Sequence, residues 1–187
     1  MDAFSYLSVL LSIILGLAIT QVLQGFRGLM LARKRLHAYW PCIAWAVLLL
    51  VLDVQVWWAM YILRWRHVWS FVSFAAVLAQ TIPLYLLAGL VLPDAGTHEQ
   101  LDLRRHYYDN HRWFFTILAL LLAASFIKQL VLFGNLPVSL DTGVQLLFLI
   151  AAVVAACTSR EWFHKALVPF SAITIGAYIA LLYPYLH

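Results

Sequence analysis

Charged side chains are scarce in this sequence. Asp, Glu, Lys and Arg make up 11% of its 187 residues, whereas 65% of the residues are hydrophobic. A soluble domain usually carries about 25% charged residues. A chain this poor in charge cannot cover a water-facing surface, which excludes disorder, a nucleic-acid-binding domain and a conventional soluble enzyme. The net charge of +4 indicates no acidic partner by itself, because the positions of the cations matter more than their sum.

Motifs of common catalytic sites are also missing. The sequence has no Gly-rich phosphate or dinucleotide loop, no Cys-x-x-Cys pair and no serine-hydrolase elbow. The histidines lack the spacing of a histidine box, and none lies deep in an apolar segment, which argues against a bis-histidine haem site. We therefore predict a protein that is not an enzyme and that needs no cofactor.

Most of the chain falls into six apolar segments: 4–26, 40–63, 70–92, 113–133, 143–158 and 166–186. A helix needs about 20 mostly apolar residues to cross a hydrocarbon core about 30 Å thick. Five segments meet this length, and the short one, 143–158, can begin earlier, near Val138. The segments are continuously apolar rather than alternating, which favours helices over a barrel. The sequence predicts a single all-α domain, a bundle of six transmembrane helices.

The positive residues predict an orientation. With six spans both termini share a side, and cytoplasmic loops are rich in Lys and Arg. The odd-numbered loops hold Arg27, Arg33, Lys34, Arg35, Arg104, Arg105, Arg112, Arg160 and Lys165, whereas the even-numbered loops hold Arg64 and Arg66. We therefore expect cytoplasmic odd loops and periplasmic termini. Cys42 and Cys157 then lie at cytoplasmic ends, where thiols stay reduced.

The first segment has no Lys or Arg before its apolar run and no small-residue cleavage site, so we expect a span rather than a cleaved signal. Its string Phe4-Ser-Tyr-Leu-Ser-Val-Leu-Leu-Ser-Ile-Ile-Leu-Gly-Leu is similar to the start of small bacterial membrane proteins. The resemblance covers one helix and carries no function. The expected location is a bacterial inner membrane, with lipids as partners and no nucleic acid.

Two charged residues fall inside the predicted spans. Asp53 and Lys128 lie roughly 20 and 22 Å from the cytoplasmic ends of their segments, at 1.5 Å per residue. Ser12, Gln80 and Tyr178 lie at similar depths of about 18–21 Å. Together they form a candidate polar site at the membrane midplane. An Asp53–Lys128 pair that locks two helices, a proton or ion relay, and side chains that never meet remain alternatives.

A stripe of small and polar residues follows the first span. Ser8, Ser12, Gly16, Thr20 and Gln24 recur every four residues and share one helix face. Small residues at this spacing let helices approach closely in lipid. We expect a helix-packing contact, inside the bundle or between protomers, in preference to a face that lines a solute path. A homo-oligomer is expected on this ground, and an unknown membrane partner is the alternative.

Two features of the sequence are typical of transporters. Pro83 lies inside the third segment, where it marks either a broken helix at a site or a tolerated kink. Ile19-Thr20-Gln21 matches Ile127-Lys128-Gln129, and Thr81-Ile82-x-x-Tyr85 matches Thr174-Ile175-x-x-Tyr178. These matches suggest a 3+3 inverted repeat, with chance similarity of apolar sequence as the alternative.

His98, Asp102 and His106 are spaced so that they would share one face of a helix. Such a face can bind a divalent metal, but the stretch is also typical of a solvated extension of the fourth span. The extension is favoured, so no metal site is predicted.

The polar layer and the possible repeat favour a small permease, channel or proton/ion-coupled carrier with its site at the midplane. The alternative is a non-catalytic membrane subunit or scaffold that acts through oligomerisation or partner proteins. An intramembrane enzyme is disfavoured, because no nucleophile, metal set or cofactor motif lies at a suitable depth.

Overall fold

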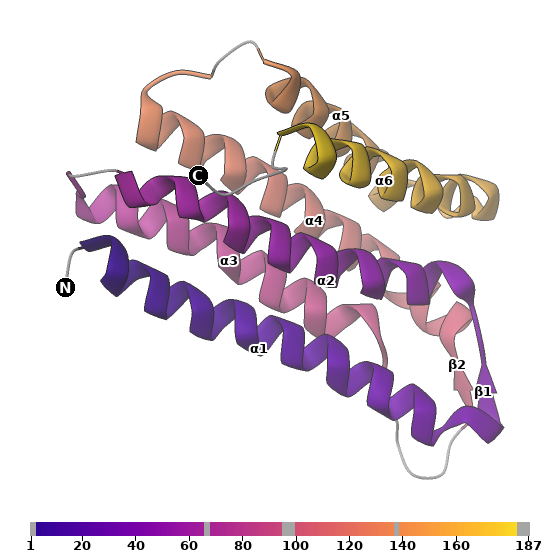
Figure 1. The fold of residues 1–187 in the computed structure, drawn as a ribbon. Helices are drawn as coiled ribbons and strands as arrows, with labels where there is room; N and C mark the ends of the chain where they lie inside the picture. The colour runs from indigo at the N-terminus through magenta and orange to yellow at the C-terminus, as the bar shows by residue number, and fades with distance from the viewer. Residues whose placement is uncertain (1–2, 66–67, 95–99, 137–138, 183–187) are drawn as a thin grey trace.

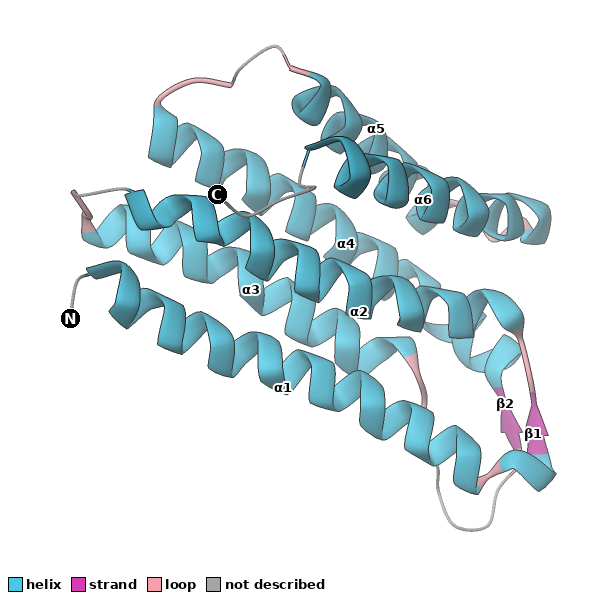
Figure 2. Ribbon diagram, in the orientation of Figure 1, coloured by secondary structure: helices cyan, strands magenta, loops and turns pink. Residues whose placement is uncertain are grey.

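The structure, a computed structural model, describes residues 3–65, 68–94, 100–136 and 139–182. Within these ranges the chain is built almost wholly of helices that lie side by side (Figure 1, Figure 2). The six long helices are α1 (Ala3–Leu31), α2 (Trp40–Met60), α3 (Phe71–Val91), α4 (Leu103–Phe133), α5 (Leu140–Cys157) and α6 (Glu161–Leu182). The short elements are the 3-10 helices η1 (Arg33–Arg35) and η2 (Tyr61–Trp65) and the strands β1 (Leu36–His37) and β2 (Leu101–Asp102).

The all-α prediction is confirmed, and each of the six long helices is long and apolar enough to cross a membrane. The doubtful fifth segment forms a helix that starts at Leu140, slightly before the predicted 143. Its start is fixed by Ser139, whose Oγ accepts a hydrogen bond from the backbone N–H of Thr142 at 3.3 Å. A serine cap of this kind satisfies a backbone donor that the first helical turn leaves free.

Helix α4 begins at Leu103, well before the predicted 113. Asp102 caps it: Oδ1 accepts hydrogen bonds from the backbone N–H groups of Arg104 at 2.9 Å and Arg105 at 3.1 Å. These bonds hold the pKa of the Asp102 carboxyl below its usual value. The helical extension of the fourth span is therefore present, and its N-terminus is set by this aspartate.

The predicted helix face of His98, Asp102 and His106 is wrong. Asp102 lies in β2 and caps α4, so it does not share a helix face with His106. His98 lies outside the described residues. Among the residues that are described, no group of three or more His, Cys, Asp or Glu side chains could hold a metal.

The helices form two parts that share α2 and α4. Helix α1 lies along α3 and also contacts α2, and α3 lies along α4. On the other side, α5 lies along α4, while α6 contacts α2 and α5 (Figure 1). Among α1, α2 and α3 the main contact is therefore between α1 and α3, whereas among α4, α5 and α6 it is between α4 and α5. The 3+3 repeat remains a prediction.

One end of the bundle is tied together by contacts between segments far apart in sequence. Strand β1 pairs in parallel with β2, with Leu36 opposite Leu101 and His37 opposite Asp102. At the same end, the guanidinium of Arg104 donates to Glu161 Oε2 at 2.7 Å, which joins the start of α4 to the start of α6. The loop before α2, the start of α4 and the start of α6 thus lie at one end.

The buried face of α1 is not the small-residue stripe. Its buried side chains are Leu7, Leu11, Leu15, Ala18, Val22 and Leu29. Ser8 is half-buried, whereas Ser12, Gly16, Thr20 and Gln24 are exposed, and a Cβ added at Gly16 would meet no atom within 4 Å. Most of the stripe is therefore exposed, and its member Ser12 accepts a hydrogen bond from another described helix, from Trp57 Nε1 of α2. The apolar face is the buried one, and Gly16, Thr20 and Gln24 of the stripe face outward.

Pro83 does not break its helix. The structure is helical without interruption from Phe71 to Val91, with Pro83 inside this range. Of the two alternatives that the sequence left open, the broken helix is therefore absent.

Candidate ligand-binding cavity

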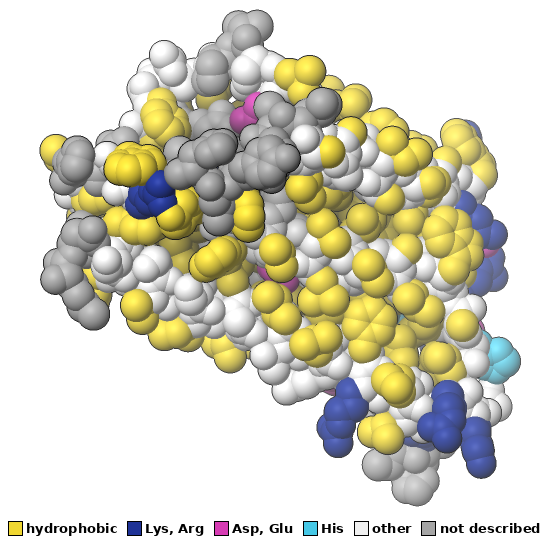
Figure 3. Space-filling model, in the orientation of Figure 1, with side chains coloured by type: hydrophobic (Ala, Val, Ile, Leu, Met, Phe, Trp, Pro, Cys, Tyr) yellow, Lys and Arg dark blue, Asp and Glu magenta, His cyan; other side chains and the backbone are white. Residues whose placement is uncertain are grey.

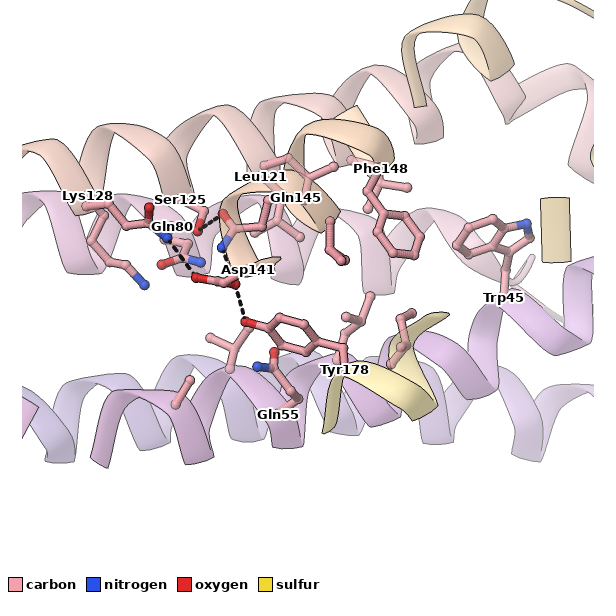
Figure 4. A pocket seen from close by; sticks show the side chains of 18 residues that line it. Trp45, Gln55, Gln80, Leu121, Ser125, Lys128, Asp141, Gln145, Phe148 and Tyr178 are labelled. Atoms are coloured by element: carbon pink, nitrogen blue, oxygen red, sulfur yellow. Dashed lines mark hydrogen bonds between the residues drawn. The ribbon is translucent and has the colours of Figure 1, made fainter. Parts of the chain in front are cut away.

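A cavity of about 150 Å³ lies among α2, α4, α5 and α6, and Gln80 of α3 also lines it. Figure 4 shows that its labelled side chains are unevenly distributed. The polar side chains gather in one half, and Phe148 and Trp45 lie toward the other. The cavity is therefore amphipathic, as small-molecule sites usually are.

Helical spacing places the polar groups. On α4, Ser125, Lys128 and Gln129 are three and four residues apart and so share one face. On α5, Asp141 and Gln145 are four residues apart, in the first turns of the helix. All five line the cavity.

Asp141 is the centre of a hydrogen-bond network. Its Oδ1 accepts hydrogen bonds from the Tyr178 hydroxyl at 2.6 Å and from Gln145 Nε2 at 2.8 Å. Its Oδ2 accepts one from Gln129 Nε2 at 3.4 Å, and Ser125 Oγ donates to Gln145 Oε1 at 3.1 Å. The network joins α4, α5 and α6, and every donor to the carboxylate is an uncharged group.

Several polar groups of the cavity have no hydrogen-bond partner among the described residues. Within the described residues, Lys128 takes part in no hydrogen bond and in no ion pair within 4.0 Å, although it lines the same cavity as Asp141 (Figure 4). The Oε1 atoms of Gln80 and Gln129 are buried without a hydrogen-bond partner, and Gln80 is 6% exposed. Unpaired polar groups in a buried site cost free energy, so they mark places where a ligand or water can bind.

The rest of the cavity wall is apolar. Phe148 of α5, Leu118 and Leu121 of α4 and Ile175 of α6 line it. At the far end lies Trp45, whose ring packs edge-on against Phe115 at a centroid distance of 5.4 Å.

The structure brings three of the five predicted midplane residues together. Gln80, Lys128 and Tyr178 line the cavity, whereas Asp53 and Ser12 do not. Asp53 is 1% exposed, and its two carboxylate oxygens have no hydrogen-bond partner among the described residues. Ser12 is exposed, and its Oγ accepts a hydrogen bond from Trp57 Nε1 at 3.3 Å.

Of the alternatives that the sequence left open, the Asp53–Lys128 ion pair is absent from the described residues. On α2 the cavity is lined by Leu52, Gln55, Val56 and Ala59, which share one helix face. Asp53 follows Leu52 by one residue, a rotation of about 100° around the helix, so it lies off this face. The depth of the two charges is similar, but their directions differ.

Sequence reasoning missed Asp141, Gln145, Gln129, Ser125 and Gln55. Asp141 lies outside the predicted apolar segment 143–158, and the possible earlier start near Val138 does not by itself indicate a site residue. Two signals could have found it: a serine two residues earlier that can cap a helix, and the polar Asp141–Gln145 pair at one-turn spacing.

A second polar cluster lies at the end of the bundle that carries β1 and β2. His164 is fully buried, and its Nε2 lies 2.8 Å from the carbonyl oxygen of Thr158. A carbonyl only accepts, so Nε2 carries a proton, and in a neutral ring Nδ1 accepts from the Tyr107 hydroxyl at 3.0 Å. Nearby, burial and the contact with the Tyr108 hydroxyl raise the pKa of Tyr39 far above its usual value. The Tyr107–His164 bond joins α4 to α6, and the Tyr39–Tyr108 contact joins the N-cap of α2 to α4.

No protein-family model, curated protein or solved structure matches this chain. No relative therefore supplies a function for the cavity, and its side chains are the basis on which a function can be inferred.

Proposed function

We propose that this chain is a small membrane permease or proton/ion-coupled carrier that binds its solute in the cavity among α2, α4, α5 and α6. The observation that carries this proposal is the pair of opposite charges in that cavity: Asp141, which is hydrogen-bonded, and Lys128, which makes no hydrogen bond or ion pair within 4.0 Å among the described residues. Ionisable groups within membrane helices are costly, and they usually face a substrate or ion path. An ion pair that only holds two helices together would need Asp141 and Lys128 in contact. No ion pair between them is present in the described residues.

The proposed location is a bacterial inner membrane with both termini in the periplasm and the odd loops in the cytoplasm. Lys and Arg side chains gather at the end that carries β1 and β2, and fewer lie at the opposite end (Figure 3). Hydrophobic side chains cover the flank between them. In this orientation the polar half of the cavity lies nearer the periplasm, because Asp141 lies in the first turn of α5 and Lys128 in the last turns of α4.

The test is uptake into proteoliposomes. Purified wild-type protein is reconstituted, and the entry of four labelled small solutes is followed: glycerol, propionate, ethylamine and L-alanine. We expect at least one to enter faster than into vesicles without protein, and Lys128→Met to abolish the difference. Lys165→Met, at the opposite end of the bundle, is the matched control and is expected to transport normally. If all four solutes enter as slowly as into empty vesicles, the transport proposal is wrong.

The second candidate is a non-catalytic subunit or scaffold that acts as a homo-oligomer or with a membrane partner. It is favoured by the outward-facing stripe of α1, where Gly16 has open space around it. Small residues on an exposed helix face allow a second helix to approach closely in lipid. Native mass measurement in nanodiscs tests this: an oligomer is expected for the wild type, and Gly16→Leu should dissociate it. A wild-type protein that is monomeric in nanodiscs contradicts this candidate.

A further inference from the structure

We propose that the cavity binds a small zwitterion, with the ligand carboxylate at Lys128, its ammonium group at Asp141 and a short apolar skeleton against Phe148. This inference rests on the proposed function, because it names the class of solute that the same cavity takes.

The charges argue for a ligand that carries both signs. Lys128 has no acceptor within the described part of the cavity, and the carboxylate of Asp141 is held by uncharged donors alone. An ionised group in a low-dielectric site is stabilised by an opposite charge in contact with it. An anion would neutralise Lys128 and leave Asp141, and a cation would do the reverse. A dipolar ion neutralises both.

The hydrogen-bonding atoms agree with this arrangement. An ammonium group has three N–H donors and no acceptor. Gln80 and Gln129 line the same cavity as Asp141, and the buried Oε1 atom of each has no hydrogen-bond partner among the described residues. With the two amide groups turned into the cavity, these oxygens and the Asp141 carboxylate would supply acceptors for all three donors. Figure 4 shows Gln80, Lys128 and Asp141 at the same end of the cavity.

The size of the cavity limits the ligand. A dry protein cavity of about 150 Å³ accepts a molecule the size of benzene, and this cavity has about the same volume, 150 Å³. A short amino acid has a similar number of heavy atoms, whereas a nucleotide or a sugar phosphate does not fit. The apolar half, with Phe148, Leu121 and Ile175, suits one small aliphatic substituent.

The experiment measures binding to the wild-type protein in nanodiscs with a matched panel. L-Alanine carries both charges, propionate lacks the ammonium, ethylamine lacks the carboxylate and propionamide lacks both. Glycine, β-alanine and 4-aminobutyrate then vary the separation of the charges. The readout is the ligand-induced rise in unfolding temperature, followed by tryptophan fluorescence, with Kd from titration.

We expect at least one zwitterion to bind at least about tenfold more tightly than propionate and ethylamine, since a site that pairs a polar group rejects an analogue that lacks it. Lys128→Met and Asp141→Asn should each remove this preference, and Lys165→Met should keep it. The wild-type panel decides the matter even if a cavity variant does not fold. Equal binding of propionate and the zwitterions, or no binding of any zwitterion, overturns the inference.

Failure of this inference is separable from failure of the proposed function. If propionate or glycerol enters proteoliposomes faster than into empty vesicles while no zwitterion binds, the solute class is wrong and transport stands. If a zwitterion binds with the expected preference while none of the labelled solutes is transported, the cavity is a binding site and the permease proposal is wrong.

Discussion

The hydroxyl of Tyr178 in α6 donates a hydrogen bond of 2.6 Å to Oδ1 of Asp141 in the first turn of α5. The same oxygen accepts a bond from Gln145, one turn further along α5. Helix α6 makes few other contacts with α5, so this bond helps to place α6 across the cavity. The network therefore has a structural role as well as a place in the candidate site.

Tyr178→Phe removes this bond while it keeps the ring. We expect the free energy of unfolding to fall by about 0.5–2 kcal/mol, because hydrogen bonds to charged groups are worth more than neutral ones but interhelical bonds in membranes are modest. Unfolding in detergent micelles measures the change. Tyr6→Phe is the control, since the Tyr6 ring stacks on Phe74 and no hydrogen bond of its hydroxyl is described. An equal loss in both variants would contradict the structural role.

Gly25 and Gly16 lie on the same helix but differ in their surroundings. A Cβ on Gly25 would lie 2.8 Å from Cβ and from Cδ1 of Leu92, whereas a Cβ on Gly16 would meet nothing within 4 Å. Gly25→Ala should therefore destabilise the protein by about 1–3 kcal/mol through overpacking. Gly16→Ala should leave the stability of the monomer unchanged or raise it by up to about 1 kcal/mol, because alanine favours a helix. Chemical unfolding of the two variants tests the difference, and equal stabilities would show that α1 does not approach Leu92 closely.

The sequence predicted the helices well because their signal is large. Length and continuous apolarity identified all six, and errors were confined to their ends, where a single cap such as Asp102 or Ser139 decides the first turn. Apolarity does not report a start that a polar residue fixes. This is why α4 was begun too late and why Asp141 was missed.

The candidate site was predicted only in part, because depth along a helix says nothing about direction around it. Lys128, Gln80 and Tyr178 lie in one cavity, but Asp53 at a similar depth faces elsewhere on α2. The stripe on α1 is a second example. The four-residue spacing correctly places the stripe residues on one helix face, but the buried face is the neighbouring one, which is rich in leucine. Which face is inside depends on the other helices, and a single helix pattern does not contain that information.

Asp102 makes the stability of the α4 N-terminus depend on pH. The backbone N–H groups of Arg105 and Arg104 lower the pKa of its carboxyl in the folded state. A lowered pKa means that the stabilisation is complete above the unfolded pKa of about 3.9 and is lost as the pH falls through the folded pKa. The unfolding temperature of the wild type should therefore exceed that of Asp102→Ala at pH 7, and the two should converge in acid. Asp102→Asn, which caps without titrating, should keep its advantage over alanine at low pH. A constant difference between wild type and alanine variant would contradict this.

The distribution of basic residues predicts the orientation of the chain. Arg33, Lys34 and Arg35 lie at the same end as Arg104, because β1 pairs with β2 there. A reporter active in the periplasm, fused after residue 187, should give a signal, and a reporter active in the cytoplasm should not. The same reporters fused after Arg35 should give the reverse result. A cytoplasmic signal from the C-terminal fusion would overturn the orientation.

Asp53 and Lys128 should contribute independently to stability. A buried ion pair would lose about 3–5 kcal/mol when one partner is removed, and the double variant would recover much of it. Since no ion pair joins them in the described residues, Asp53→Asn and Lys128→Met should add within about 0.5 kcal/mol. The cycle of Lys128→Met with Asp141→Asn is the comparison: these residues share the cavity, and a coupling energy of about 0.5–3 kcal/mol is expected between them. Both cycles are measured by unfolding in the same detergent. The contrary result is strong coupling between Lys128 and Asp53 with no coupling between Lys128 and Asp141. It would show that the charge of Lys128 is directed toward Asp53 on α2. The cavity would then lack its cation.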